Sequence, residues 1–345
     1  MSMNSAETEF LDTEKPRICV LFPGALGDFI CFLPALRQCA DASAVDVLAR
    51  SEFAAIAPPG VNVNSLERSE VRLLFTDGGA ADPRVIQFFS AYTAVYSWFA
   101  SRQSVFVEQL QKAARGRAQI FPFRPDKITS HQADYYLSCL NRNVPKAPQP
   151  LVQPRRDALL WCDNVYPRSG INSEPFLIMA PGSGAKGKNW PEAHYLRVAH
   201  WWREQCGGKA VVVVGPVEAE RHSFEHLSSY CHVASGLDLA QLTALIARCD
   251  VYVGNDSGVS HLAAAVGART VVIFGPSDER QWAPLGPRVS ILRRRIACSP
   301  CGDTAMGLCL HRACLAELTP AEVIHELRKL TEIGNLTSPG SGITV

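Results

Sequence analysis

The sequence predicts an α/β protein of two Rossmann-like domains, each a doubly wound parallel sheet, that face a cleft. Short apolar runs alternate with longer segments of helical period along most of the 345 residues. Such alternation is typical of a parallel sheet covered by helices on both faces. It occurs twice, on either side of a proline-rich segment at 142–157, and the length itself favours two domains.

The first half of the chain contains five runs with the composition of strands and three longer helical stretches. The expected strands are 17–22, 45–49, 71–75, 94–98 and 118–121, and the expected helices are 29–40, 103–114 and 130–141. We assign residues 1–150 to an N-terminal domain that ends within the proline-rich connection.

The second alternation predicts a C-terminal domain over residues 151–333. Its expected strands are 176–180, 210–214, 250–253 and 270–274, and its expected helices are 191–205, 217–229, 239–248 and 258–267. Asp238 with Gln241 resembles a capping box, and so does Thr319 with Glu322, which has proline at the first helical position. The Gly/Ser/Pro-rich tail, 334–345, is expected to be disordered.

Composition excludes several classes of protein. Lys and Arg total 34 against 33 Asp and Glu, and this balance disfavours a nucleic-acid partner. Apolar runs stay shorter than the roughly 20 residues that a spanning helix needs. Residues 1–15 lack the basic start and apolar stretch of a signal peptide. We therefore expect a cytoplasmic protein, with peripheral contact at the inner face of the cytoplasmic membrane left open.

A glycine motif, Gly24–Asp28, directly follows the first expected strand. Glycines at a strand-to-helix turn let a ligand approach the backbone, and helix N-termini favour anions. The spacing is not that of the dinucleotide fingerprint, which disfavours NAD. Asp28 lies where the strand opens into the crevice between domains. The alternative is that Asp28 only caps the following helix.

A second loop, Pro181–Pro191, links the strand at 176–180 to a helix. Its backbone amides, the Ser183 hydroxyl and a lysine ammonium at Lys186 or Lys188 suit a diphosphate. It is not a P-loop, because the Gly-Lys-Ser/Thr arrangement is missing. The alternative is a solvated basic loop.

The third motif, Gly254–His261, opens a helix whose first amides have no partner within the helix. The amides of Ser257, Gly258 and Val259 form an anion site, and Asp256 caps the helix or contacts a ligand. His261 shares a helix face with Ser257; alternatively, it is a core histidine. Glu218 follows the strand at 210–214 and places a carboxylate where a ribose or base can be held.

These segments resemble glycosyltransferase family 9, the ADP-heptose:lipopolysaccharide heptosyltransferases. The resemblance covers residues 17–330 and is carried by GALGDFICFLPAL, PGSGAKGKNWPEAHY, GPVEAER, VGNDSGVSHLAAAVGARTVVIFGPSD and the CSPC element. It implies the GT-B fold, with the acceptor on the N-terminal domain and a nucleotide-sugar donor on the C-terminal one. It further implies an inverting transferase that needs no metal or cofactor for catalysis.

Carried over to this chain, the resemblance makes Asp28 the general base and Lys188 the lysine that binds the donor phosphates. The other donor-binding residues it implies are Gly27, Ser183, Glu218, Asp256, Ser257, Gly258, Val259 and His261. The expected reaction moves heptose from ADP-heptose to a lipopolysaccharide core or another glycan or glycolipid acceptor. Residues 50–130 show no clear match to the family's basic acceptor pocket, which leaves the acceptor and the heptose assignment open.

Two other functions fit the same fold: a non-catalytic nucleotide-sugar-binding protein, which would not need Asp28, and a sugar-nucleotide epimerase. A separate feature is the cluster Cys298, Cys301, Cys309 and Cys314, which has plausible zinc or iron spacing. The family often carries cysteines here, and related autotransporter heptosyltransferases use such a cluster for iron. A structural metal is one expectation, and free thiols or a labile disulfide are the other.

Overall fold

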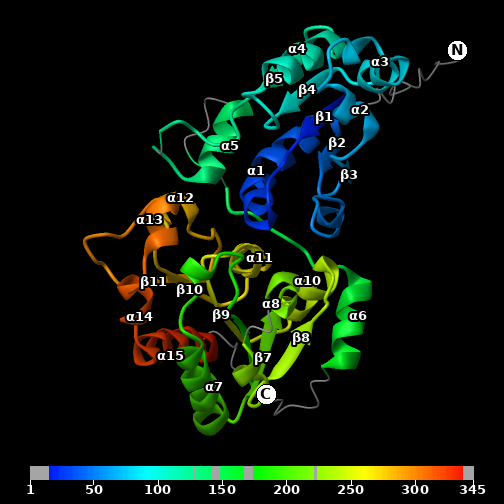
Figure 1. Cartoon of the computed structure of the whole chain (residues 1–345). Helices are drawn as coiled ribbons and strands as arrows, with labels where there is room; N and C mark the ends of the chain where they lie inside the picture. The colour runs from blue at the N-terminus through cyan, green and yellow to red at the C-terminus, as the bar shows by residue number, and fades with distance from the viewer. Residues whose placement is uncertain are drawn as a thin grey trace, which may run out of the picture.

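The computed structural model describes residues 15–127, 129–140, 146, 148–166, 174–220 and 224–336. Two lobes are visible, one holding strands β1 to β5 and the other strands β6 to β11 (Figure 1). Helix α1 (Leu26–Ala42) of the first lobe packs against helix α11 (Gly258–Val266) of the second, where the lobes meet.

The first sheet has the strand order β3-β2-β1-β4-β5, and every pair is parallel. Its strands are β1 (Arg17–Leu21), β2 (Ala44–Ala49), β3 (Val61–Ser65), β4 (Ala94–Ser97) and β5 (Ala118–Ile120). Its longer helices are α1, α3 (Pro83–Ser90), α4 (Ser104–Ala113) and α5 (Gln132–Leu140). The order reverses between β1 and β4, which creates a crevice at the carboxyl end of β1.

The second sheet has the order β11-β10-β9-β6-β7-β8, again parallel throughout. Its strands are β6 (Phe176–Ala180), β7 (Lys209–Val214), β8 (His232–Ser235), β9 (Val251–Asn255), β10 (Thr270–Phe274) and β11 (Val289–Arg293). Its longer helices are α6 (Arg156–Val165), α7 (Glu192–Cys206), α10 (Leu239–Ala247), α11 and α15 (Pro320–Leu336). The switch point lies between β6 and β9. The predicted pair of doubly wound sheets is confirmed.

Residues 71–75 are not the strand that their apolar run predicted. They lie in helix α2 (Ser69–Leu73) and the turn after it, with Val71 and Leu74 buried three positions apart on one face. The strand that pairs with β2 is β3, which was missed because its sequence, VNVNS, is half-polar at a sheet edge. The edge strands β8 and β11 were missed as well.

Both predicted capping boxes are present. Asp238 accepts from the amide of Gln241, whose side chain accepts from the Asp238 amide, and the Glu322 carboxylate accepts from the Thr319 amide. Helix α15 runs to Leu336, into the first residues of the expected tail, and residues 337–345 lie outside the described residues. In the described part of the chain, no helix has the length and apolar character needed to cross a membrane.

Candidate active site

The predicted site loops follow β1, β6 and β9, the strands at the two switch points. Two glycines let the lobes approach closely there. A methyl group on Gly258 would lie 2.9 Å from the Cβ of Leu26 and 3.0 Å from the backbone nitrogen of Gly27. A methyl group on Gly27 would lie 3.2 Å from the ring of His261. The N-terminus of α1, which carries Asp28, therefore meets the N-terminus of α11 directly.

Asp28 uses both carboxylate oxygens. One accepts from the Ala25 amide at 3.1 Å, so the capping role is real, and the other accepts from the Arg124 guanidinium at 2.5 Å. The side chain is 13% exposed. A carboxylate offers about four acceptor positions, so these two bonds leave room for an acceptor hydroxyl.

Arg124 was not predicted from the sequence. Its guanidinium also donates to the Tyr136 hydroxyl at 2.7 Å and lies 4.6 Å from the ring centre of Trp282, in α12 (Glu279–Trp282) of the other lobe. Burial raises the pKa of Tyr136, so its hydroxyl is neutral. Arg124 therefore links Asp28 to the C-terminal lobe. A lone arginine after a short strand carries no sequence signal for this.

Lys188 and Asp256 form an ion pair, with 2.8 Å between the ammonium and the carboxylate. Asp256 is buried, whereas Lys188 keeps 28% of its side chain exposed. Asp256 lies two residues before Gly258, which contacts Leu26 and Gly27 of the α1 motif. Burial raises the pKa of the Cys31 thiol in α1, and the carboxylates of Asp28 and Asp256 raise it further.

The glycine loop after β6 is held from several sides. The Ser183 hydroxyl lies 2.8 Å from the Ala185 carbonyl and 2.5 Å from the Asn189 amide oxygen, so it is used within the loop. Glu218, on α8 (Pro216–Glu220), packs against Gly182, where a methyl group would lie 2.5 Å from the carboxylate. Both predicted donor residues therefore hold the loop in this conformation.

Asn255 connects the loops after β6 and β9, a role that its position in the third motif did not reveal. Its fully buried side chain accepts from the Trp190 amide at 3.0 Å and the Tyr195 hydroxyl at 3.1 Å, and it donates to the Pro181 carbonyl at 2.5 Å. Because Asn255 immediately precedes Asp256, these bonds fix the position of Asp256 opposite Lys188.

Ser257 is the N-cap of α11, accepting from the Ser260 amide at 3.4 Å, and the amides of Gly258 and Val259 are among the first of that helix. His261 is 4% exposed, with its Nδ1 3.7 Å from the Cys31 sulfur. Burial lowers the pKa of His261 to about 4, so the ring is neutral at neutral pH. The structure thus places His261 at the packed contact between α1 and α11.

The four clustered cysteines line one small cavity together with His311. Burial raises the pKa of Cys314, and the other three cysteines raise it further. Nevertheless, the described residues contain no group of three or more His, Cys, Asp or Glu side chains arranged to hold a metal ion. In the described part of the chain, the four thiols therefore lie near one another without forming such a group.

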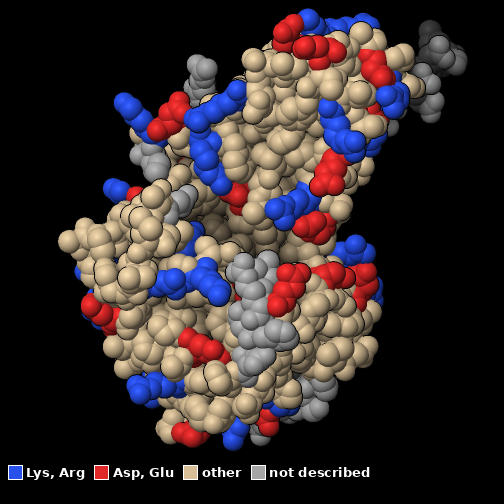
Figure 2. Space-filling model, in the orientation of Figure 1, with Lys and Arg blue, Asp and Glu red and all other residues tan. Residues whose placement is uncertain are grey.

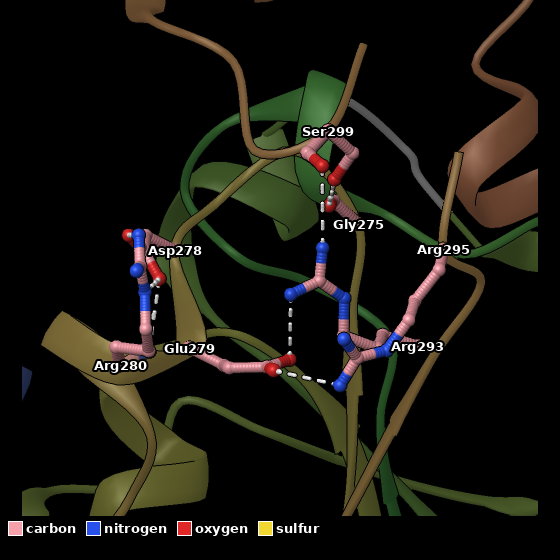
Figure 3. Close-up of polar contacts among 7 residues, drawn as sticks. All are labelled: Gly275, Asp278, Glu279, Arg280, Arg293, Arg295 and Ser299. Carbon is pink, nitrogen blue, oxygen red and sulfur yellow. Dashed lines mark hydrogen bonds and ion pairs between the residues drawn. The ribbon is translucent and has the colours of Figure 1, made fainter. Parts of the chain in front are cut away.

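A polar network ties this cysteine loop to the end of β10 (Figure 3). Arg293 lies 2.9 Å from the Glu279 carboxylate and donates to the Ser299 carbonyl at 3.4 Å. The Ser299 hydroxyl donates to the Gly275 carbonyl at 2.6 Å. Glu279 begins the helix that ends at Trp282, so the network fixes the helix against which Arg124 stacks.

The model of glycosyltransferase family 9 (heptosyltransferase) matches residues 134–308, about half of the chain. The chain belongs to this family. The matched region contains every predicted donor residue except Gly27, while Asp28 and Arg124 lie before it.

Among curated relatives in the family, lipopolysaccharide heptosyltransferase 2 of Salmonella typhimurium is 30% identical over 223 residues. The alignment spans 60% of this chain and 62% of the relative, and so less than two thirds of either. Among solved structures, the Escherichia coli ADP-heptose lipopolysaccharide heptosyltransferase II is similar with a TM-score of 0.69 and 19% identity, covering 92% of this chain and 99% of that one.

The iron-containing dodecameric glycosyltransferase of enterotoxigenic E. coli H10407 is also similar, with a TM-score of 0.61 and 16% identity over 94% of this chain and 77% of that one. At these identities the likeness to both solved structures shows the fold. The two-lobed, parallel-sheet architecture is therefore the GT-B fold that the sequence predicted.

Proposed function

We propose that this chain transfers heptose from ADP-heptose to a sugar of the lipopolysaccharide core, with inversion at the anomeric carbon and without a catalytic metal. The observation that carries the proposal is the meeting of two helix N-termini at Gly27 and Gly258. This contact brings the end of α1 that carries Asp28 against the N-terminus of α11, which begins two residues after the Asp256 that pairs with Lys188. Family membership and the names of the relatives support the choice of sugar and nucleotide.

In the proposed reaction, Asp28 accepts the proton of the acceptor hydroxyl while the oxygen of that hydroxyl attacks the anomeric carbon of the donor. The bond between that carbon and the diphosphate oxygen breaks, and ADP leaves with the electron pair. Arg124 and the Ala25 amide hold the Asp28 carboxylate in one orientation.

The leaving diphosphate requires positive charge on the C-terminal lobe. Lys188 is the cation predicted for this role, and the diphosphate either replaces Asp256 as the partner of its ammonium group or shares that group with Asp256. The amides of Gly258 and Val259 add the favourable end of the α11 dipole. Glu218 then exchanges its contact with Gly182 for the ribose of the nucleoside.

The direct test is to follow ADP release from ADP-heptose, with and without a heptose-deficient lipopolysaccharide core as acceptor. We expect release that depends on the acceptor, persists in EDTA and yields the opposite anomer by NMR. Acceptor-dependent release of UDP from a UDP-sugar, without release of ADP from ADP-heptose, would reject the donor assignment. Retention of configuration would reject the single displacement.

A further inference from the structure

The N-terminal lobe contains a cavity of about 740 Å³ at the carboxyl ends of its strands, large enough for a small glycan. Phe22 and Pro23 form part of its wall and lead directly into the loop that carries Asp28. Phe22 and Asp28 both pack against Gly24, where a methyl group would lie 2.5 Å from the Phe22 ring and 2.6 Å from the Asp28 Cβ. The cavity therefore adjoins the proposed base.

The charged side chains of this cavity balance. Arg50 and Arg72 face it together with Glu52 and Glu67, which gives a formal charge of zero. Arg50 and Glu52 lie 4.0 Å apart and partly neutralise each other. Positive and negative side chains are likewise interspersed around the hollow between the lobes (Figure 2). A phosphate ester in such a cavity would meet two carboxylates as well as two guanidiniums, so it would gain little.

An aromatic surface completes the cavity. Phe75 leaves 43% of its surface exposed, unusual for so large an apolar side chain, and it lines the cavity with Phe99. The two rings meet edge to face with their centres 5.7 Å apart, and Phe106 supports Phe75 from behind at 4.9 Å. A rigid, half-exposed ring of this kind suits the apolar C–H face of a pyranose.

We propose that this cavity binds the acceptor, and that the acceptor is a sugar without phosphate esters, held by stacking on Phe75. The inference rests on the proposed function, since it assigns the acceptor class for the same reaction. The lining of this cavity, with its balanced charges and half-exposed Phe75, selects apolar faces and hydroxyl groups over phosphate.

The test uses two probes, a phosphorylated lipopolysaccharide core oligosaccharide and the same oligosaccharide dephosphorylated with hydrofluoric acid. Binding of each to the full-length protein with saturating ADP is followed by saturation-transfer NMR. We expect roughly tenfold tighter binding of the dephosphorylated probe, because a phosphate in this cavity loses hydration that the balanced charges do not replace. Phe75→Ala should weaken that binding about tenfold and Phe75→Tyr should preserve it, because the tyrosine ring still stacks.

A second variant tests the charge balance without touching the aromatic surface. Glu52→Gln with Glu67→Gln leaves the two arginines unopposed and should raise the affinity for the phosphorylated probe several-fold. Equal or tighter binding of the phosphorylated probe by the wild type, unchanged binding by Phe75→Ala, or no binding of either probe would overturn the inference. Transfer from ADP-heptose is measured separately: transfer to the phosphorylated probe alone refutes the inference and leaves the proposed function standing, whereas binding without any transfer refutes the function.

Discussion

The guanidinium of Arg124 lies 2.5 Å from the carboxylate of Asp28 and stacks, at 4.6 Å, over Trp282 of the opposite lobe. One side chain thus touches both the proposed base and the other half of the molecule. Orientation of Asp28 is therefore coupled to the way the lobes meet. We treat Arg124 as a positioning residue, because its contact to the chemistry runs through Asp28.

Replacement of Arg124 by alanine should lower kcat about 10- to 100-fold, since it removes a charge-assisted hydrogen bond to Asp28. Affinity for ADP should stay within about twofold, because the donor residues other than Gly27 lie on the other lobe. Arg124→Lys keeps the charge but loses the planar stacking, so it should recover part of the rate. Steady-state kinetics and calorimetry with ADP check this; a normal kcat for Arg124→Ala would remove the residue from the mechanism.

Lys188→Ala should weaken ADP binding by about 10- to 100-fold, because it removes the cation that we assign to the diphosphate and leaves the Asp256 carboxylate to repel that diphosphate. Lys186→Ala is the matched control from the same short turn. Its backbone carbonyl accepts from Arg312, and this contact does not involve the side chain that the substitution removes. Calorimetric titration with ADP compares the two. A larger loss for Lys186→Ala would reassign the phosphate-binding lysine.

His261 should make the stability of the protein depend on pH. Its pKa in the folded chain is about 4, below the ordinary value of 6.5, so the unfolded chain takes up a proton first as the pH falls. The neutral His261 ring therefore contributes to the free energy of unfolding fully above about pH 6.5. This contribution, up to about 3 kcal/mol, is lost as the pH falls towards 4. When the pH is lowered from 7 to 5, the Tm of His261→Gln should therefore fall less than the Tm of the wild type.

The exposed His232 provides the control for this comparison. His232→Gln should follow the wild-type dependence of Tm on pH, because it leaves the buried His261 and its surroundings unchanged. Parallel curves for wild type and His261→Gln would show that His261 is not the group responsible.

The cysteine cluster should react unevenly with iodoacetamide. Cys298 is exposed, whereas Cys314 is buried and its pKa is raised, so its reactive thiolate is scarcer. Mass spectrometry after brief labelling of the native protein should find Cys298 modified well before Cys314. Protection of all four thiols, with near-stoichiometric zinc or iron in the purified protein, would instead establish the metal site that their spacing suggested.

The sequence predicted the interior of both sheets well, for a physical reason. Strands β6 and β10 are buried at every position and are apolar throughout, except for Thr270 at the start of β10, so composition alone identifies them. Edge strands such as β3 lack this property, because only one side of the ladder is covered. The apolar run at 71–75 shows the opposite error, since a short run does not distinguish a strand from a helical turn.

In the candidate site as well, the sequence predicted the residues that a local pattern marks and missed the contacts between distant residues. Asp28, Lys188 and Asp256 lie in or directly after glycine-rich turns at strand ends, where loop composition reveals the position. The contacts of Arg124 with Asp28, and of His261 with Cys31, join residues 96 and 230 positions apart, which no local pattern encodes. Glu218 and Ser183 were predicted as ligand contacts, and the structure adds that both stabilise the loop itself.

The most direct test of the account is Asp28→Asn, measured for turnover, melting and ADP affinity together. The amide keeps the size of the carboxylate and part of its cap, so stability should fall by no more than about 1 kcal/mol. ADP affinity should barely change, whereas turnover of ADP-heptose should fall by about two to four orders of magnitude, since the amide cannot accept the acceptor proton. A variant with normal melting, normal ADP binding and near-normal turnover would contradict the assignment of Asp28 as the base, and the proposed mechanism with it.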